Sequence, residues 1–374
     1  AAPDSLPLDK IRSIQVGNAL RLDWGDVVQP TEHLYIMGNP PFLGHATRSL
    51  EQAQELRDVW HRKDIGRLDY VTGWYAKSLE LFNRQGYAGE FAFVSTNSIA
   101  QGEPVPALFG PVFATGWRIK FAHRTFAWTS EAPGAAAVHC SVIGFDRASK
   151  RRARLFDYSG NVKGEPVELP VAGQLNGYLV DGPVALVEQR RTPLARQLPP
   201  MVFGNMARDD GNLLIEAEDY DEVAADPVAA KYIRPFVGAR QLIHNEPRWC
   251  LWLVDLDPSD IARSPVLRHR LDAVRQFRAA STAESTRQMA ETPHLFGQRS
   301  QPETPYVCVP RHVSETRRYY PTAVFGPEVI CGDANFKADD PDGIAFAVVS
   351  SSAFIAWQKA VGGRIKSDLR FSNT

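Results

Sequence analysis

The sequence predicts an α/β fold in which a doubly wound, mainly parallel sheet is followed by a second domain of α+β type. In the first half, short apolar runs alternate with segments whose apolar residues recur every three or four positions, a pattern typical of strands alternating with helices. After about residue 149 the composition changes: prolines become frequent and short β-like runs alternate with helices. The 374 residues are 44% hydrophobic, which is enough for two domains with their own cores.

The elements of the first half follow one another in a regular order. Strands are expected at 11–16, 34–37, 91–95, 118–122 and 135–145. Helices are expected at 50–61, 69–84 and 104–114. Because no helix pattern separates the last two strands, we expect an antiparallel hairpin at the sheet edge, joined by a loop over 123–134.

The second half gives weaker periodic signals. We place a domain boundary near residue 165, with one domain over 1–165 and another over 166–374. Short β-like runs are expected at 249–254, 306–309 and 345–349, and strand-like alternation at 329–337. A long helix with a basic face is expected over 263–287, with a kink near Ser281.

Charge and cysteine usage restrict the class of protein. The formal net charge is −1, which gives no global basic signature of a nucleic-acid-binding protein. Local basic runs such as 150–152, 190–191 and 317–318 could contact phosphates or be solvated surface. The four cysteines are widely spaced and form no CxxC pair, so we expect buried free thiols, no metal site and a cytoplasmic protein. No apolar run is long enough to span a bilayer.

The segment Asn39-Pro40-Pro41-Phe42 carries the strongest chemical signal. It directly follows a predicted strand, so it lies at the carboxyl edge of a parallel sheet, where ligands bind in open α/β folds. Two prolines make a rigid turn that presents carbonyl groups. The Asn39 side-chain oxygen and the Pro40 carbonyl could accept both N–H groups of a nucleobase amine and aim its lone pair at a methyl donor, while Phe42 stacks on the base. The alternative is a rigid Asn-Pro turn beside a buried phenylalanine.

This segment resembles motif IV of the class I amino-group methyltransferases, which use S-adenosylmethionine. Asn18 and Ala19 resemble the motif III turn, and Asp69-Tyr70 resembles motif V. The resemblance implies a partial class I methyltransferase sheet and places these four residues beside the cofactor.

Two further segments continue the resemblance in the same order. Residues 93–98 resemble motif VI, and Phe126-Ala127-Trp128 resembles motif VIII, whose aromatic side chain stacks on the target base. A base amine is paired inside a duplex, so the base must be flipped out, and Phe42 and Phe126 would then form the two faces around it. On its own, Phe126 could equally be a core aromatic residue.

The second half resembles the target-recognition domain of MmeI-type enzymes, in which nuclease, methyltransferase and recognition domain share one chain. The matching blocks lie at 176–183, 201–206, 231–239, 249–253, 293–297 and 363–368. The resemblance implies double-stranded DNA as partner. Asp333 and Asn335, two apart on the expected strand, would share a face and read one base pair, unless they belong to a turn. Arg364, Lys366 and Arg370 could hold phosphates, or could belong to a solvated helix end.

Taken together, these resemblances imply a site-specific DNA adenine-N6 methyltransferase of a restriction-modification system. Cytosine-N4 methylation and a DNA-binding specificity subunit without catalysis remain alternatives; methylation of protein glutamine or RNA guanine fits less well, because of the large second domain.

The chain also departs from the family pattern. No glycine-rich donor loop precedes residue 11, and no nuclease metal constellation is present; both would lie upstream in a full-length relative. We therefore expect this chain alone to be inactive, to bind the donor weakly, and to expose a sheet edge and an apolar face that promote self-association.

Overall fold

The computed structural model describes residues 14–29, 31, 33–65, 67–84, 86–128, 138–148, 151–158, 161–190, 192, 195, 198–365 and 368–372. The chain divides into two compact units, Ala1–Gln189 and Arg190–Thr374, which are described separately. Residues after 165 pack on the first unit: Arg124 Nε donates to the Leu179 carbonyl at 3.0 Å. The domain boundary near residue 165 stays a prediction.

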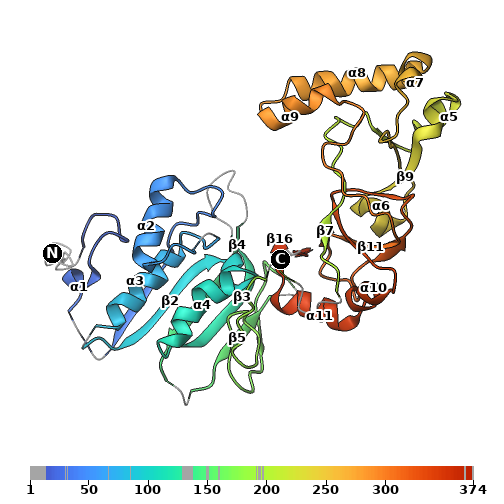
Figure 1. Cartoon of the computed structure of the whole chain (residues 1–374). Coiled ribbons are helices and arrows are strands. Elements are labelled where there is room, and N and C mark those ends of the chain that lie inside the picture. The colour runs from blue at the N-terminus through green and yellow to red at the C-terminus, as the bar shows by residue number, and fades with distance from the viewer. Residues whose placement is uncertain are drawn as a thin grey trace, which may run out of the picture. The chain divides into compact units, whose positions relative to one another are not determined.

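A six-stranded mixed sheet forms the centre of the first unit (Figure 1). Its order is β1 (Leu34–Gly38), β2 (Gly89–Thr96), β4 (Val138–Asp146), β3 (Arg118–Trp128), β5 (Arg154–Asp157) and β6 (Val167–Leu169). Strand β1 runs parallel to β2, and β3 and β4 form the expected antiparallel pair. The expected edge position is wrong, because β4 lies between β2 and β3, and β5 and β6 extend the sheet beyond β3.

Helices cover one face of this sheet (Figure 1). The helical elements are α1 (Trp24–Val27), α2 (Leu50–Trp60), α3 (Thr72–Phe82), η1 (Asn97–Ala100) and α4 (Pro104–Ala114). From α3, the buried Tyr75 ring contacts the rings of Phe91, Phe93 and Phe145 at centroid distances between 5.2 and 6.1 Å. From α4, Phe109 contacts Phe145 at 6.2 Å. These aromatic contacts fix the helices on the sheet face that bears the core.

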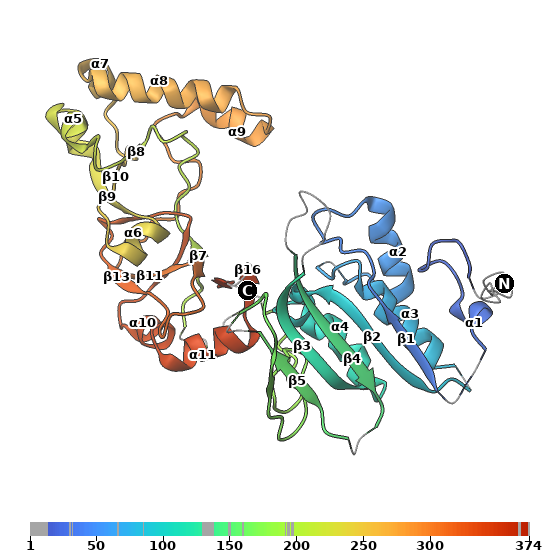
Figure 2. The ribbon, with the colours of Figure 1, turned by 180° about the vertical axis from the view of Figure 1, so that it is seen from behind.

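The opposite face of the sheet carries no described helix (Figure 2). The register aligns Met37, Ala92, Gly144 and Phe121 on this face. The absence of a side chain at Gly144 is required here, because the Phe121 ring occupies the place of a Cβ. Tyr35 and Met37 are 59% and 78% exposed on β1, so the expected exposed apolar face is present in the described residues.

Two sequence expectations in the first unit need correction. Of the strand expected at 11–16, residues 11–13 lie outside the described part and 14–16 are not in a strand. The segment expected as a loop from 123 onward continues β3 as far as Trp128, since Phe126 and Trp128 pair with Cys140 and Val138 of β4. The pairing of β3 with β4 shifts register between His123 and Phe126, so the strand continues past a bulge at the point where the loop was expected to begin.

The second unit is a mixed α+β structure. Its strands are β7 (Val202–Phe203), β8 (Leu214–Ile215), β9 (Ile233–Val237), β10 (Trp249–Leu251), β11 (Tyr306–Pro310), β12 (His312–Val313), β13 (Ala323–Phe325), β14 (Ile330–Cys331), β15 (Asn335–Asp339), β16 (Gly363–Ile365) and β17 (Asp368–Arg370). They form sheets ordered β14-β9-β10-β8, β13-β11-β15-β7 and β12-β17-β16. Its helices are α5 (Tyr220–Ala225), η2 (Ala229–Tyr232), α6 (Ala239–His244), α7 (Pro258–Arg263), α8 (Pro265–Ala279), α9 (Glu284–Gln288), η3 (Met289–Glu291), α10 (Ile344–Val349) and α11 (Ser352–Val361).

These elements enclose separate clusters of apolar side chains. One lies between β8, β9, β10 and α8, and includes Leu251, Leu271 and Val274. Another lies between β11, β15, α10 and α11, and includes Val307 and Ile355. Helices α7 to α9 lie at one end of the unit, and α10 and α11 at the other (Figure 1).

Three expectations change in the second unit. The long helix is interrupted after Ala279, close to the expected kink, and continues as α9. The β-like run at 345–349 is helix α10, and the Asp340 carboxylate accepts the N–H groups of Ala345 and Phe346 in its first turn at 2.9 and 2.8 Å. The alternating run at 329–337 is two strands, β14 and β15, separated by a turn.

Neither a membrane-spanning helix nor a cluster of metal-ligating side chains occurs among the described residues. No helix among them is both long and apolar enough to cross a membrane. No cluster of three or more potential metal-ligating side chains occurs in the same part of the chain.

Candidate active site

The turn Asn39-Pro40-Pro41-Phe42 follows β1 directly and lies at the carboxyl end of that strand. Pro40 is buried and anchors the turn, Phe42 is half-buried, and Asn39 and Pro41 are exposed. Asn39 is therefore accessible to a ligand, which a catalytic role requires. The chemical roles of the four residues stay predictions.

The buried Asp69 carboxylate holds the chain that leaves this turn. Its Oδ1 accepts hydrogen bonds from the backbone N–H groups of Leu43, at 3.1 Å, and Val71, at 3.2 Å. Its Oδ2 accepts the Thr96 hydroxyl at 3.0 Å. A backbone bond from Tyr70 N–H to the Leu43 carbonyl, at 3.0 Å, closes the arrangement. The turn after β1, the start of α3 and the end of β2 therefore meet at one carboxylate.

A second buried carboxylate, Glu55 of α2, organises the predicted cofactor side. It accepts bonds from Asn18 Nδ2 at 2.8 Å, from Arg21 Nε at 2.7 Å and from the Tyr70 hydroxyl. The Asn18 Oδ1 accepts the Leu20 N–H at 3.0 Å, so both ends of the Asn18 amide are held. Burial, assisted by Glu55, raises the pKa of Tyr70 to about 12, which keeps the hydroxyl protonated as a donor.

The structure joins three of the four predicted cofactor-side residues through this network. Asn18 and Tyr70 share Glu55, and Asp69 precedes Tyr70 in the chain. Ala19 is half-buried, and its carbonyl accepts the Trp24 indole N–H at 2.9 Å. Whether these residues contact a cofactor stays a prediction.

Glu55 was not identified as a site residue from the sequence, although its position in the helix indicates a buried carboxylate. Positions 52, 55, 56, 59 and 60 form one helical stripe, and this stripe includes the buried Leu56 and Trp60. An acidic residue inside an apolar stripe indicates a buried charge that needs hydrogen-bond partners.

The predicted stacking residues Phe126 and Trp128 lie near the end of β3. Phe126 and Thr96 both pair with Cys140, so Phe126 is level with the end of β2. The Phe126 ring is half-buried and contacts Tyr158 at a centroid distance of 5.2 Å, and Trp128 is 40% exposed. Asn97 Nδ2 donates to Thr125 Oγ1 at 3.3 Å and links the same two strand ends. A stacking role for Phe126 and Trp128 stays a prediction.

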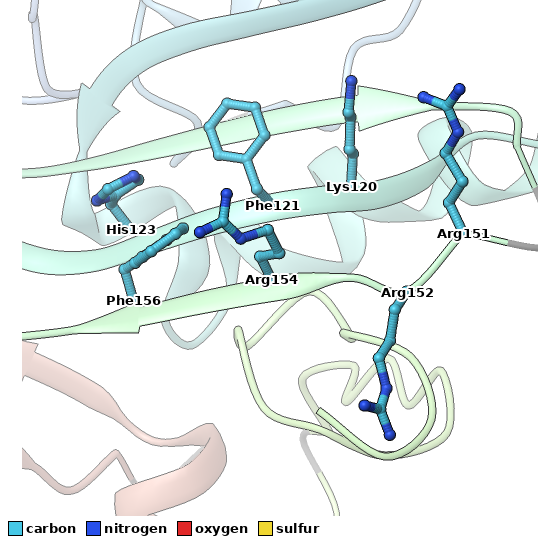
Figure 3. A pocket seen from close by; sticks show the side chains of 7 residues that line it. All are labelled: Lys120, Phe121, His123, Arg151, Arg152, Arg154 and Phe156. Carbon is cyan, nitrogen blue, oxygen red and sulfur yellow. The ribbon is translucent and has the colours of Figure 1, made fainter. Parts of the chain in front are cut away.

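A cavity of about 320 Å³ lies on the helix-free face over β3 and β5 (Figure 3). It is lined by Lys120, Phe121, His123, Arg151, Arg152, Arg154 and Phe156. The His123 and Phe156 rings stack at 4.4 Å, and the Arg154 guanidinium lies 4.8 Å from the Phe156 centroid. Arg154 also pairs with Glu168 at 2.9 Å, and Lys120 pairs with Glu90. Carboxylates therefore neutralise part of the positive charge of this cavity.

The predicted DNA-reading pair is not on one strand. Asp333 lies in the turn between β14 and β15 and is partly exposed, whereas Asn335 begins β15 and is fully buried. The Asn335 Nδ2 donates to the Val237 carbonyl at 2.9 Å. The shared-face argument is therefore wrong, and a base-reading role for either residue stays a prediction.

Two of the predicted phosphate ligands lie in the hairpin β16–β17: Arg364 is in β16, where it also donates to the Lys359 carbonyl near the end of α11, and Arg370 is in β17. Arg364 forms an ion pair with Glu315 at 2.5 Å, and Arg370 of β17 is exposed. Lys366 lies outside the described residues. A role in phosphate binding remains a prediction for all three.

Known proteins resemble both units of the chain. Residues 1–157 match the family described as MmeI, DNA-methyltransferase domain, and residues 181–374 match MmeI, target recognition domain. DNA methyltransferase A of Bacillus subtilis (strain 168) is 31% identical over 379 residues, covering 100% of this chain and 42% of that protein. The structure of the Type IIL restriction-modification enzyme MmeI in complex with DNA is 38% identical, with a TM-score of 0.82 over 96% of this chain and 48% of that chain.

The chain thus spans less than half the length of these relatives. The likeness confirms the expected fold, a methyltransferase sheet followed by a mixed recognition domain.

Proposed function

The chain belongs to the MmeI family of DNA methyltransferases with a target recognition domain, and on this premise we propose that it serves S-adenosylmethionine-dependent methylation of adenine N6 in a specific duplex sequence. The protein would act within a restriction-modification system, with nuclease and donor-loop segments supplied by the same full-length chain. Because the chain spans less than half of its relatives, the activity is proposed for the complete gene product.

The observation that carries this proposal is the exposed Asn39 in a rigid turn at the carboxyl end of β1. Pro40 is buried and its ring fixes the backbone torsion, so the turn would hold the Pro40 carbonyl in a fixed position relative to Asn39. Two fixed acceptors suit an amine with two N–H groups, since accepting both would draw the nitrogen toward tetrahedral geometry and free its lone pair.

Stacking would hold the extruded base. Phe42 is half-buried, so its ring is supported by the protein and still accessible to a ligand. Phe126 and Trp128 lie at the end of β3, level with the end of β2, and are partly exposed. We propose that these aromatic side chains compensate for the stacking that a base loses when it leaves the duplex.

The residues around Glu55 fit a role beside the methyl donor. Asn18 is exposed, yet both ends of its amide are fixed by hydrogen bonds, so the Asn18-Ala19 turn is a preorganised surface. Asn18, Ala19 and Tyr70 would line one side of the S-adenosylmethionine site, and Asp69 would support that side from within the protein. The bound donor supplies the methyl group, and these residues orient it.

Sequence recognition would fall to the second unit. Asp333 is the partly exposed member of the predicted reading pair, and a carboxylate can accept from cytosine N4. Arg364, Lys366 and Arg370 would contact phosphates. Such contacts position the protein on the duplex but do not distinguish one base sequence from another. For Arg364, binding would compete with its ion pair to Glu315.

Replacing the exposed asparagine tests the proposal. In the complete gene product, Asn39→Ala should abolish methylation, whereas Asn83→Ala, an exposed asparagine at the end of α3, should leave it intact. Nucleoside analysis of the methylated DNA should reveal N6-methyladenine. N4-methylcytosine instead would support the cytosine alternative, and an active Asn39→Ala variant would refute the site.

A catalytically silent specificity subunit is the remaining alternative. It predicts sequence-specific DNA binding by the complete gene product without any transfer of labelled methyl groups. The expectation that this chain alone is inactive can be checked by calorimetry: low-micromolar binding of S-adenosylmethionine to these 374 residues would contradict it.

A further inference from the structure

We propose that Asp69 is a positioning residue that fixes the Asn39–Phe42 turn for methyl transfer through the backbone of Leu43. This inference rests on the proposed function, because it concerns the same turn. It assigns the Asp69 carboxylate to the protein scaffold and not to contact with the methyl donor.

The geometry accounts for both carboxylate oxygens. Oδ1 accepts the N–H groups of Leu43 and Val71, and Oδ2 accepts the Thr96 hydroxyl, at distances between 3.0 and 3.2 Å. Leu43 is the residue immediately after Phe42, and Thr96 is the last residue of β2. Asp69 is 5% exposed, so little of its surface is left for a ligand.

A second bond fixes Leu43 from its other side. The Leu43 carbonyl accepts the N–H of Tyr70, the residue next to Asp69, at 3.0 Å. The backbone N–H and the backbone carbonyl of Leu43 are therefore both held by the dipeptide Asp69-Tyr70. Because β1 is fixed at the other end of the turn by its pairing with β2, the four residues between are held at both ends.

This arrangement requires hydrogen-bond acceptors at the position of the Asp69 oxygens, but it does not require the negative charge of the carboxylate. An asparagine has nearly the shape of aspartate, and its amide oxygen could accept both backbone N–H groups. Its NH₂ group could donate to the Thr96 hydroxyl oxygen, which lies 2.9 Å from Ser98 Oγ and can donate there in turn. An alanine leaves two buried N–H groups without an acceptor, so the Leu43 backbone would shift.

The two substitutions therefore separate positioning from a charge-dependent role. In the complete gene product, Asp69→Ala should lower kcat about 100-fold, the loss expected when reacting groups are misplaced by about 1 Å. The KM for S-adenosylmethionine and the affinity for DNA should change little. Asp69→Asn should restore most of kcat. Thr96→Val, which removes one of the three donors, should lower kcat by less than Asp69→Ala without lowering Tm, and it carries the test if Asp69→Ala does not fold.

Asp146 provides a matched control at the opposite end of the sheet. It is also a buried aspartate, and it pairs with Arg118 at 2.7 Å at the end of β4. Asp146→Ala should lower Tm without the selective loss of kcat. The positioning role would be overturned if the kcat of Asp69→Asn were as low as that of Asp69→Ala, or if Asp69→Ala had a normal kcat. If Asn39→Ala also remains active, the proposed function itself fails; if Asn39→Ala is inactive, only the role of Asp69 is refuted.

Discussion

Asn18 Nδ2 donates a hydrogen bond of 2.8 Å to Glu55 Oε1, across 37 positions of the chain. The same carboxylate accepts the Tyr70 hydroxyl, and Tyr70 follows Asp69, which holds the backbone after the Asn39–Phe42 turn. Two buried carboxylates therefore connect the turn predicted to contact the donor with the turn predicted to contact the base. This connection is the physical basis of the predictions for Asp69 and Glu55.

Removal of the Glu55 carboxylate should weaken the binding of S-adenosylmethionine more than the binding of DNA. Glu55→Ala frees the Asn18 amide and leaves the Tyr70 hydroxyl without its acceptor, at a cost of about 1–3 kcal/mol. In the complete gene product we expect the KM for S-adenosylmethionine to rise about tenfold, equivalent to about 1.4 kcal/mol. Glu51→Ala is the control, since Glu51 is exposed and contacts only Arg21 of this group. An unchanged KM for S-adenosylmethionine in Glu55→Ala would show that the hydrogen bonds of Glu55 do not support the donor site.

The second unit should depend strongly on one buried arginine. Arg278 of α8 is fully buried, and its guanidinium donates to five carbonyl oxygens at distances between 2.7 and 3.0 Å, those of Ala207, Arg208, Met289, Thr292 and Leu295. Arg278→Met leaves these acceptors buried without donors, so we expect urea denaturation to show a loss of about 3 kcal/mol or more. Arg275→Ala, which removes only an exposed ion pair with Asp272, should cost less than about 1 kcal/mol. Equal effects of the two substitutions would contradict this assignment.

Local patterns predicted the elements that local interactions determine. Helix α4 has the predicted bounds, because a proline occupies its first position and its apolar residues recur with helical period. The turn at Asn39 was predicted to lie at the end of a parallel strand, and it follows β1 as expected. The helix and the change from strand to turn depend on neighbours within a few residues, whereas the parallel pairing of β1 with β2 joins residues about 55 positions apart.

Long-range partners could not be predicted in the same way. The sequence predicted a basic face on the helix that contains Arg278 but no buried arginine, and Arg278 points inward because carbonyls from residues 207–208 and 289–295 converge on it. Asn335 was expected beside Asp333 on one face, but a carbonyl of β9, 98 positions earlier, holds it inside. Such partners are brought together only by the tertiary fold.

The two members of the predicted reading pair should behave differently. Asp333→Ala, at a partly exposed turn, should change the preferred base at one position of the recognition sequence while phosphate-driven binding persists. Asn335→Ala should instead lower Tm, because it removes the buried donor to the Val237 carbonyl. Methylation of a randomised DNA library and thermal unfolding would measure both effects. An unchanged recognition sequence in Asp333→Ala would show that Asp333 does not read a base.

His123 should make the first unit less stable in mild acid. Burial, assisted by the nearby Arg154, lowers the pKa of His123, whose ring stacks on Phe156. The unfolded chain takes up this proton more readily than the folded chain. The stabilising contribution is therefore present above about pH 6.5 and is lost as the pH falls through the lower pKa of the folded state. The difference in unfolding free energy between pH 7.5 and 5.5 should be smaller for His123→Gln than for wild type; an equal difference would contradict the prediction.

The exposed strand β1 should cause this chain to self-associate when it is produced alone. In the described residues β1 pairs only with β2, and Tyr35 and Met37 are largely exposed on the helix-free face. An unpaired strand edge beside apolar side chains favours association with a second copy. The double substitution Tyr35→Lys and Met37→Lys should therefore shift the weight-average mass toward the monomer in light scattering at rising concentration. Leu50→Lys changes an equally apolar and exposed residue at the start of α2, so it should not reproduce the shift. A wild-type chain that stays monomeric, or a Leu50→Lys variant that dissociates equally well, would show that β1 is not the cause.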